Sequence, residues 1–81
     1  MKKIYILTAY NLKQNFYTEK LYFTSYKKAL ASKKYLINYL IENHSLNENN
    51  IEKHINSTIL DDSYNITLIK ESIKTQIIRY I

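Results

Sequence analysis

The first part of the chain contains two short runs in which β-branched and aromatic residues predominate. Residues 4–10 are too short for a typical helix, so we expect a strand with apolar groups on both faces, inside a sheet. Residues 18–24 resume this pattern. The polar segment 11–16 between the runs contains Asn11 and Asn15. Because asparagine tolerates left-handed backbone unusually well, the two runs are predicted to form a β-hairpin that turns without glycine.

From Tyr26 the apolar period changes to 3.6 residues, which predicts a long amphipathic helix. Thr24 or Ser25 can cap this helix, since either hydroxyl can accept a hydrogen bond from its first turn. At about 100° per residue, one stripe contains Tyr26, Ala29, Leu30, Leu36, Ile37, Leu40 and Ile41. Lys33 falls within the stripe, where its long stem can pass between apolar neighbours. We expect the stripe to pack on the sheet, with Leu36 and Leu40 buried.

The polar segment 43–50 ends the helix, and the residues after it allow two interpretations. Ser45 and Glu48 have the spacing of a capping box, which would begin a short helix over residues 46–54. Apolar residues that recur with a period of two residues instead favour a strand, more strongly from residue 55 to residue 60. The isoleucines that set this period are Ile51, Ile55 and Ile59.

The last part of the chain is predicted to add strands to the sheet. Asp61-Asp62-Ser63 indicates a turn, and residues 66–69 a further strand. Residues 73–81 fit a helix or a strand, and their β-branched content favours a strand. The order is thus two strands, one helix, and two or three strands. This order predicts a single α+β domain over residues 1–81, in which one main amphipathic helix packs on one face of a small antiparallel sheet.

Composition narrows the classes of function. The chain has 81 residues, of which 46% are hydrophobic, and it contains no glycine, proline or cysteine. Phosphate-cradling loops, dinucleotide fingerprints and nucleophile elbows need glycine where the backbone turns or approaches a ligand closely, so enzymes of those kinds are excluded. No apolar run approaches the roughly 18 residues that cross a bilayer, and no signal-peptide cleavage site follows the N-terminus. We therefore expect a cytoplasmic protein without membrane contact.

Catalytic and metal chemistry find little support in the sequence. His44 and His54 are ten residues apart, and the only close carboxylate pair is Asp61 and Asp62. No single element sets the spacing that metal ligands need. We expect a non-enzymatic protein without catalytic residues, cofactor or metal. The alternative is a compact metal-independent ribonuclease or toxin that uses the histidines with Arg79 for acid–base work.

Positive charge is concentrated in the first half of the chain. The net charge is +5, with +7 in residues 1–40 and −2 in residues 41–81. A basic surface attracts nucleic-acid phosphates through counterion release, or an acidic protein through steering. The alternative is a solvated lysine-rich face. One arginine among twelve cations disfavours base-specific recognition, because bidentate contacts to guanine favour arginine.

A candidate binding surface lies on the side of the helix opposite the apolar stripe. Tyr35 and Tyr39 are four residues apart there, with Lys28 on the same side and Lys27 and Lys34 flanking. A tyrosine pair ringed by lysines suits a protein interface or a base-stacking platform. The alternative is that the C-terminal segment, or a second copy of the chain in a homodimer, covers the pair.

Residues 21–30 (LYFTSYKKAL) read as a strand that runs directly into a capped helix. With the short length and the element order, this segment resembles the small accessory proteins of bacteriophages and mobile elements, among them anti-CRISPR and other anti-defence inhibitors. The resemblance implies inhibition of a host defence nuclease complex, by protein–protein contact, in the host cytoplasm. It assigns no functional residue. Many such inhibitors are acidic nucleic-acid mimics, whereas this chain is basic, and a small nucleic-acid-binding protein is the alternative function.

Overall fold

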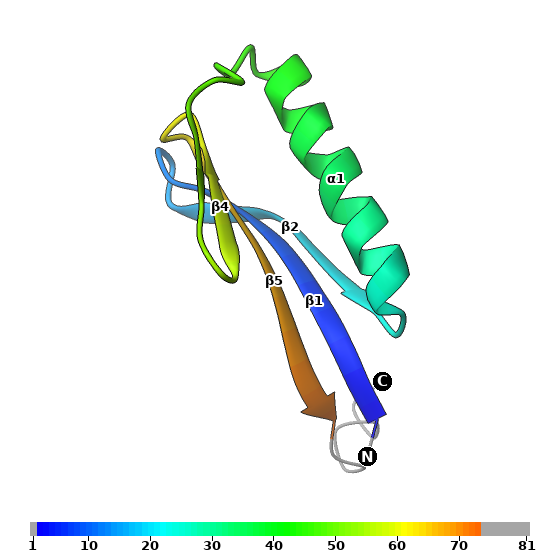
Figure 1. The fold of residues 1–81 in the computed structure, drawn as a ribbon. Coiled ribbons are helices and arrows are strands. Elements are labelled where there is room, and N and C mark those ends of the chain that lie inside the picture. Colours follow the sequence, from blue (N-terminus) through cyan, green and yellow to red (C-terminus); the bar gives the residue numbers. More distant parts are fainter. Residues whose placement is uncertain (1, 74–81) are drawn as a thin grey trace.

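The computed structural model describes residues 2–73, which form five strands and one helix (Figure 1). The elements are β1 (Lys2–Asn11), β2 (Phe16–Phe23), α1 (Tyr26–Asn43), β3 (Ile51–Lys53), β4 (Ser57–Leu60) and β5 (Tyr64–Ile73). Neighbouring strands are antiparallel in the order β2-β1-β5-β4-β3, and α1 covers one face (Figure 1). The predicted α+β class and the position of the first strand inside the sheet are confirmed. The strand predicted beyond residue 73 lies outside the described residues.

The hairpin of β1 and β2 turns without glycine, as predicted. The side chain of Asn11 accepts hydrogen bonds from the backbone N–H groups of Lys13 and Gln14, at 3.0 and 2.9 Å. Asn15 then adopts left-handed backbone with φ of 59°. These two asparagines therefore supply the local bonds and the positive φ that the turn requires.

Helix α1 begins at the predicted cap and buries three of the seven residues of the predicted stripe. The hydroxyl of Ser25 accepts a hydrogen bond from the N–H of Lys28 at 3.3 Å. Ala29, Leu36 and Leu40 are buried, and the two leucines pack into the core. That core also contains Leu7, Ala9, Leu60, Tyr64 and Ile66.

Two residues of the predicted stripe are exposed instead of buried. Tyr26 and Leu30 retain 52% and 42% of their surface. Both line a hollow between the first half of α1 and the sheet, so the stripe packs on the sheet mainly along its C-terminal half.

The helix ends in a Schellman-type turn, so of the two interpretations left open, the capping box at Ser45 and Glu48 is wrong. Ser45 has φ of 51°, and the N–H of Leu46 donates to the carbonyl of Ile41 at 3.0 Å. This 6→1 bond satisfies a carbonyl that the helix end leaves free. Ser45 therefore terminates α1 and begins no second helix, and β3 follows after a polar turn.

The isoleucines that suggested one strand are distributed over a hairpin. Ile51 pairs with Leu60, whereas Ile59 pairs with Glu52. Directly paired residues share a face, so Ile51 and Ile59 point to opposite sides of the sheet. Ile55 lies in the loop between β3 and β4 and is 98% exposed. The strand favoured from residue 55 to residue 60 is confirmed in β4, whereas the placement of Ile51, Ile55 and Ile59 on one face of one strand is wrong.

The turn predicted at Asp61 and Asp62 connects β4 to β5. Both residues have positive φ, 46° and 52°, and the N–H of Ser63 donates to the carbonyl of Leu60 at 2.8 Å. Positive φ at both central positions is the signature of a type I′ hairpin turn.

Candidate functional site

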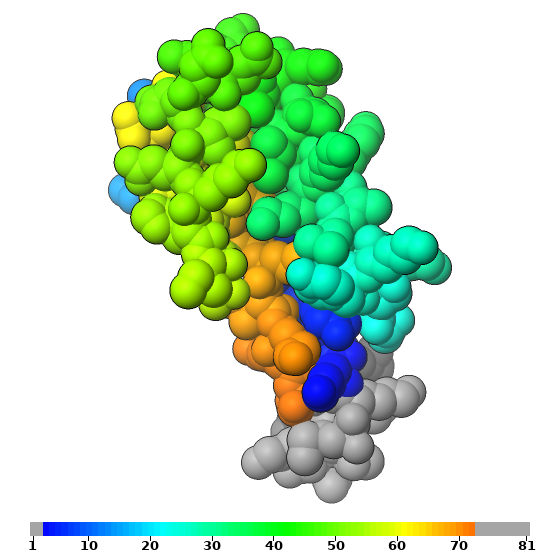
Figure 2. All heavy atoms as spheres, viewed as in Figure 1, coloured from blue at the N-terminus to red at the C-terminus, as the bar shows by residue number. Residues whose placement is uncertain are grey.

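A groove separates α1 from the β3–β4 hairpin on the helix side of the sheet. Figure 2 shows the surface hollowed between them, with β5 (orange) and β1 (blue) visible at its lower end. The groove consists of two adjoining cavities of about 410 and 480 Å³ that share Leu30 and Lys33. It follows from the packing described above, because the first half of α1 leaves Tyr26 and Leu30 uncovered.

Lysine side chains from three elements converge on this groove. Lys33 and Lys34 come from α1, Lys70 comes from β5, and Lys53 comes from the end of β3. Within the described part of the chain, no carboxylate lines either cavity. Lysines gathered without compensating acids create a positive potential that a concave surface focuses. The groove is therefore suited to an anionic ligand.

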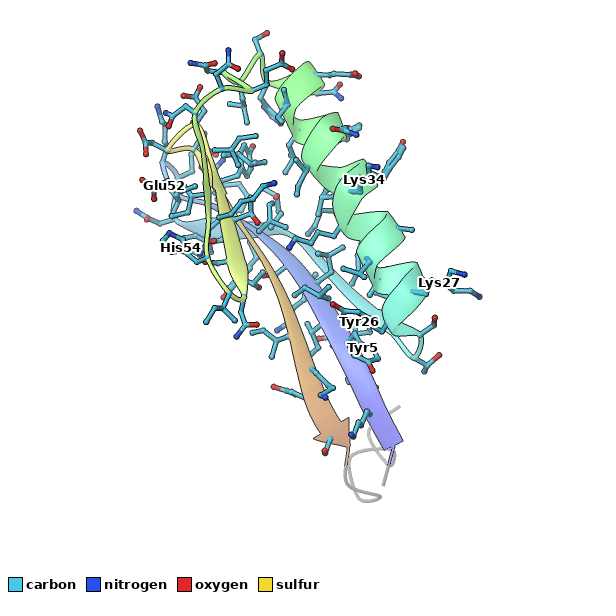
Figure 3. The ribbon with its side chains drawn as sticks, in the orientation of Figure 1. Tyr5, Tyr26, Lys27, Lys34, Glu52 and His54 are labelled. Atoms are coloured by element: carbon cyan, nitrogen blue, oxygen red, sulfur yellow. The ribbon has the colours of Figure 1, made fainter. Side chains whose placement is uncertain are left out.

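Aromatic and apolar groups lie at the end of the groove near the start of α1. Tyr5 of β1 and Tyr26 of α1 have ring centroids 5.3 Å apart, with an interplanar angle of 52° (Figure 3). Ile55, almost fully exposed, lines the same cavity from the opposite rim. This end can therefore hold a flat or apolar group, while the lysines hold charge.

The five residues predicted as a binding surface are exposed but do not form one site. Tyr35 and Tyr39 stack with centroids 6.4 Å apart and remain 73% and 48% exposed. Lys34 lines the groove on one flank of α1, whereas Tyr39 lines a cavity on the other flank. Lys27 points away from the sheet (Figure 3), and Lys28 is exposed near the helix start. Their exposure is confirmed, and their role in binding stays a prediction.

The cavity on the other flank of α1 has a volume of about 420 Å³ and a polar floor. The hydroxyl of Tyr64 lies 3.3 Å from Nε2 of His44 and accepts a hydrogen bond from the Asn11 side chain at 3.5 Å. Tyr64 is 5% exposed. Because a buried hydroxyl without partners is costly, we interpret these contacts as structural support for the core.

The histidines and aspartates considered for metal or acid–base chemistry lie in separate places. Nε2 of His54 lies 3.5 Å from a carboxylate oxygen of Glu52, whereas Nε2 of His44 lies 3.3 Å from the hydroxyl of Tyr64. Across residues 2–73 the structure has no group of three or more His, Cys, Asp or Glu side chains that could hold a metal ion. Arg79, the third residue of the ribonuclease alternative, lies outside the described residues.

Most of the groove was not predicted from the sequence. Lys33 gave the one available signal, because a lysine inside an apolar helical stripe needs an open path to solvent. Lys53, Lys70 and Tyr5 gave none, since only the sheet register and the hairpin bring them to α1.

No protein-family model, curated protein or solved structure matches this chain. In the part of the chain that the structure describes, α1 is not apolar enough to cross a membrane, and no other helix is present.

Proposed function

We propose that this protein binds single-stranded nucleic acid in the groove between α1 and the β3–β4 hairpin, without catalysis. The observation that carries the proposal is a concave surface with four lysines and no carboxylate among its lining side chains in residues 2–73. Proteins that bind single strands without sequence preference combine such a groove with aromatic side chains on which bases stack. Tyr5 and Tyr26 provide an aromatic pair at one end.

A single strand suits the groove better than a duplex does. The faces of unpaired bases are free to stack on Tyr5 or Tyr26, whereas a duplex hides them between neighbouring pairs. The cations are lysines, which act as point charges, and no arginine lines the groove in the described residues. Binding is therefore expected to tolerate many sequences.

The test compares two double variants that remove equal charge. Fluorescence anisotropy would follow a labelled single strand of about 12 nucleotides at about 50 mM salt. Lys33→Gln with Lys53→Gln removes two groove cations and should weaken binding about tenfold or more. Lys27→Gln with Lys28→Gln removes the same charge from the exposed start of α1 and should have a much smaller effect. Equal losses in both variants, or no binding by the wild type, would contradict the proposal.

The Tyr35–Tyr39 stack favours a second candidate function, inhibition of a host defence nuclease by protein contact in the cytoplasm. Two tyrosines exposed together outside the groove suit a protein interface, where tyrosine is often a hot spot worth about 2 kcal/mol or more. Replacing both by Ala should leave folding nearly intact, because exposed substitutions usually cost within about 0.5 kcal/mol.

A plasmid-interference assay in bacteria that carry a CRISPR nuclease measures this second function. Wild-type protein should protect the targeted plasmid, and the Tyr35→Ala, Tyr39→Ala variant should lose protection while its circular-dichroism melt is unchanged. A variant that protects as well as the wild type would remove the tyrosine pair from the mechanism. Wild-type protein that fails to protect against a panel of such nucleases would count against inhibition itself.

A further inference from the structure

The side of the sheet that faces away from α1 carries large apolar side chains but contributes nothing to the core. The residues of the core cluster lie on α1 or on the helix side of the sheet, as the strand registers show. We name the other side the open face. Among the described side chains, its apolar residues are Ile4, Ile6, Tyr10, Tyr17, Tyr22, Ile59 and Ile69.

Several side chains of the open face are apolar and exposed, and the polar pair at its centre is already hydrogen-bonded. Tyr22, Tyr17 and Ile69 are 60%, 59% and 43% exposed. At the centre of the face, the hydroxyls of Thr8 and Thr67 form a hydrogen bond with each other across β1 and β5. Paired hydroxyls lose little when water is removed, because each already has a partner. An apolar surface of this kind marks an interaction site in a small protein.

The charges of the open face differ from those of the groove. Among the described side chains on this face, Lys20 is the cation, and Glu52 and Glu71 are the carboxylates. A polyanion would therefore meet two acids and one lysine here. Lys20 lies on β2, at one edge of the sheet, and Glu52 lies on β3, at the other edge. The face is thus positive at one edge and negative at the opposite edge.

We propose that the open face binds a second copy of the same chain, forming a two-fold symmetric dimer in which the two sheets stack. A two-fold axis that is parallel to the strands and passes between β1 and β5 exchanges the two sides of the sheet, so β2 of one copy lies over β4 of the other, next to β3. Lys20 then comes near Glu52 of the partner subunit, twice in each dimer. The same axis places β1 near β5 of the other copy, so that Ile6 approaches Ile69 of the partner subunit.

A second copy of the chain fits the size of the sheet and the charges on its open face. In the described residues α1 covers one side of the five-stranded sheet, and a second sheet packed at about 10 Å would bury the other side. The net charge of +5 on each copy opposes association at long range. The two exchanged pairs of Lys20 and Glu52 offset this repulsion locally and fix the orientation of the copies.

Sedimentation velocity from low micromolar to near-millimolar protein tests the dimer. The wild type should approach twice the chain mass of 9.7 kDa. Ile6→Lys should raise the dissociation constant about tenfold or more, because it places an unpaired charge in the centre of the interface. Tyr35→Lys makes a matched apolar-to-lysine change on the exposed side of α1 and should leave the dimer intact.

Charge reversal provides a test that does not depend on changing an apolar residue. Lys20 and Glu52 are both exposed, so reversing their charges should leave the fold unchanged. This test therefore remains available if Ile6→Lys itself unfolds the protein. Lys20→Glu should weaken the dimer, and adding Glu52→Lys should restore it. A monomer at every concentration overturns the proposal, as does a double reversal that is no tighter than the single one. If Tyr35→Lys dissociates the dimer and Ile6→Lys does not, the interface lies on α1, and the proposal is overturned too.

Discussion

Within residues 2–73, four residues adopt left-handed backbone, in a chain that contains no glycine. They are Asn15, Ser45, Asp61 and Asp62. Asparagine and aspartate tolerate this conformation better than most residues with a Cβ, whereas a serine there carries a steric cost. In each case the turn is held by a nearby hydrogen bond, such as that from Leu46 N–H to Ile41 at Ser45. Local hydrogen bonding thus replaces the conformational freedom of glycine.

The hydrogen bonds of the single residue Asp61 predict how the stability of the protein depends on pH. Its carboxylate accepts hydrogen bonds from the backbone N–H of Asn47, at 3.0 Å, and from the side chain of Asn50, at 3.1 Å. These bonds, the first above all, hold the pKa of Asp61 below its ordinary value of 3.8, with a further contribution from Lys13. A lowered pKa in the folded state stabilises the protein above the unfolded pKa, and this stabilisation is lost as pH falls through the folded pKa.

The variant Asp61→Asn isolates this effect, since asparagine also tolerates the φ of 46° at this position. Its melting temperature should fall less steeply than that of the wild type between about pH 5 and pH 2. Thermal melts followed by circular dichroism at several pH values provide the measurement. Parallel curves for the two proteins would show that the Asp61 bonds do not contribute to acid stability.

Among the elements, the long strands and the helix were predictable from their apolar residues, whereas the short β3–β4 hairpin was not. The β1–β2 hairpin follows from two runs of β-branched and aromatic residues, and α1 follows from a period of 3.6 residues. Of the two residues predicted to cap α1, Ser25 is the observed cap. Residues 46–60 are different, because short strands contain too few residues to define a period. Ile55 also matched a strand pattern although it lies in an exposed loop. The groove was missed for the same reason, since it depends on where this hairpin lies relative to α1.

The burial along α1 predicts how its leucines contribute to stability. Leu36 and Leu40 are 7% and 3% exposed, whereas Leu30 is 42% exposed. Leu36→Ala or Leu40→Ala should cost about 2 to 5 kcal/mol, because each leaves a cavity in the core. Leu30→Ala is the matched control and should cost clearly less. Urea denaturation measures all three, and equal costs for Leu30 and Leu40 would mean that the helix faces the sheet in another orientation.

At the scale of the whole molecule, folding redistributes the charges of the sequence. The second half of the chain has a net charge of −2, yet it contributes Lys53 and Lys70 to the basic groove. The groove lies on the helix side of the sheet and the proposed dimer interface on the open face. A dimer therefore leaves both grooves accessible, and binding per chain should not depend on dimer formation.

The number of lysines in the groove sets the expected salt dependence of nucleic-acid binding. Lys33, Lys34, Lys53 and Lys70 line it. If each neutralises one phosphate of a single strand, the logarithm of the affinity should fall with the logarithm of salt concentration with a slope of about −2.8. Titrations between about 50 and 200 mM salt measure that slope.

Single variants distinguish contacts in the groove from the general attraction of a basic protein. Lys33→Gln should make the slope shallower by about 0.7, because one counterion fewer is released on binding. Lys27→Gln removes an equal charge from a side chain that points away from the sheet (Figure 3) and should leave the slope unchanged. If both variants reduce the slope equally, the nucleic acid follows the net charge of +5 and not the groove. A wild-type slope near zero would mean that phosphate contacts do not hold the ligand at all.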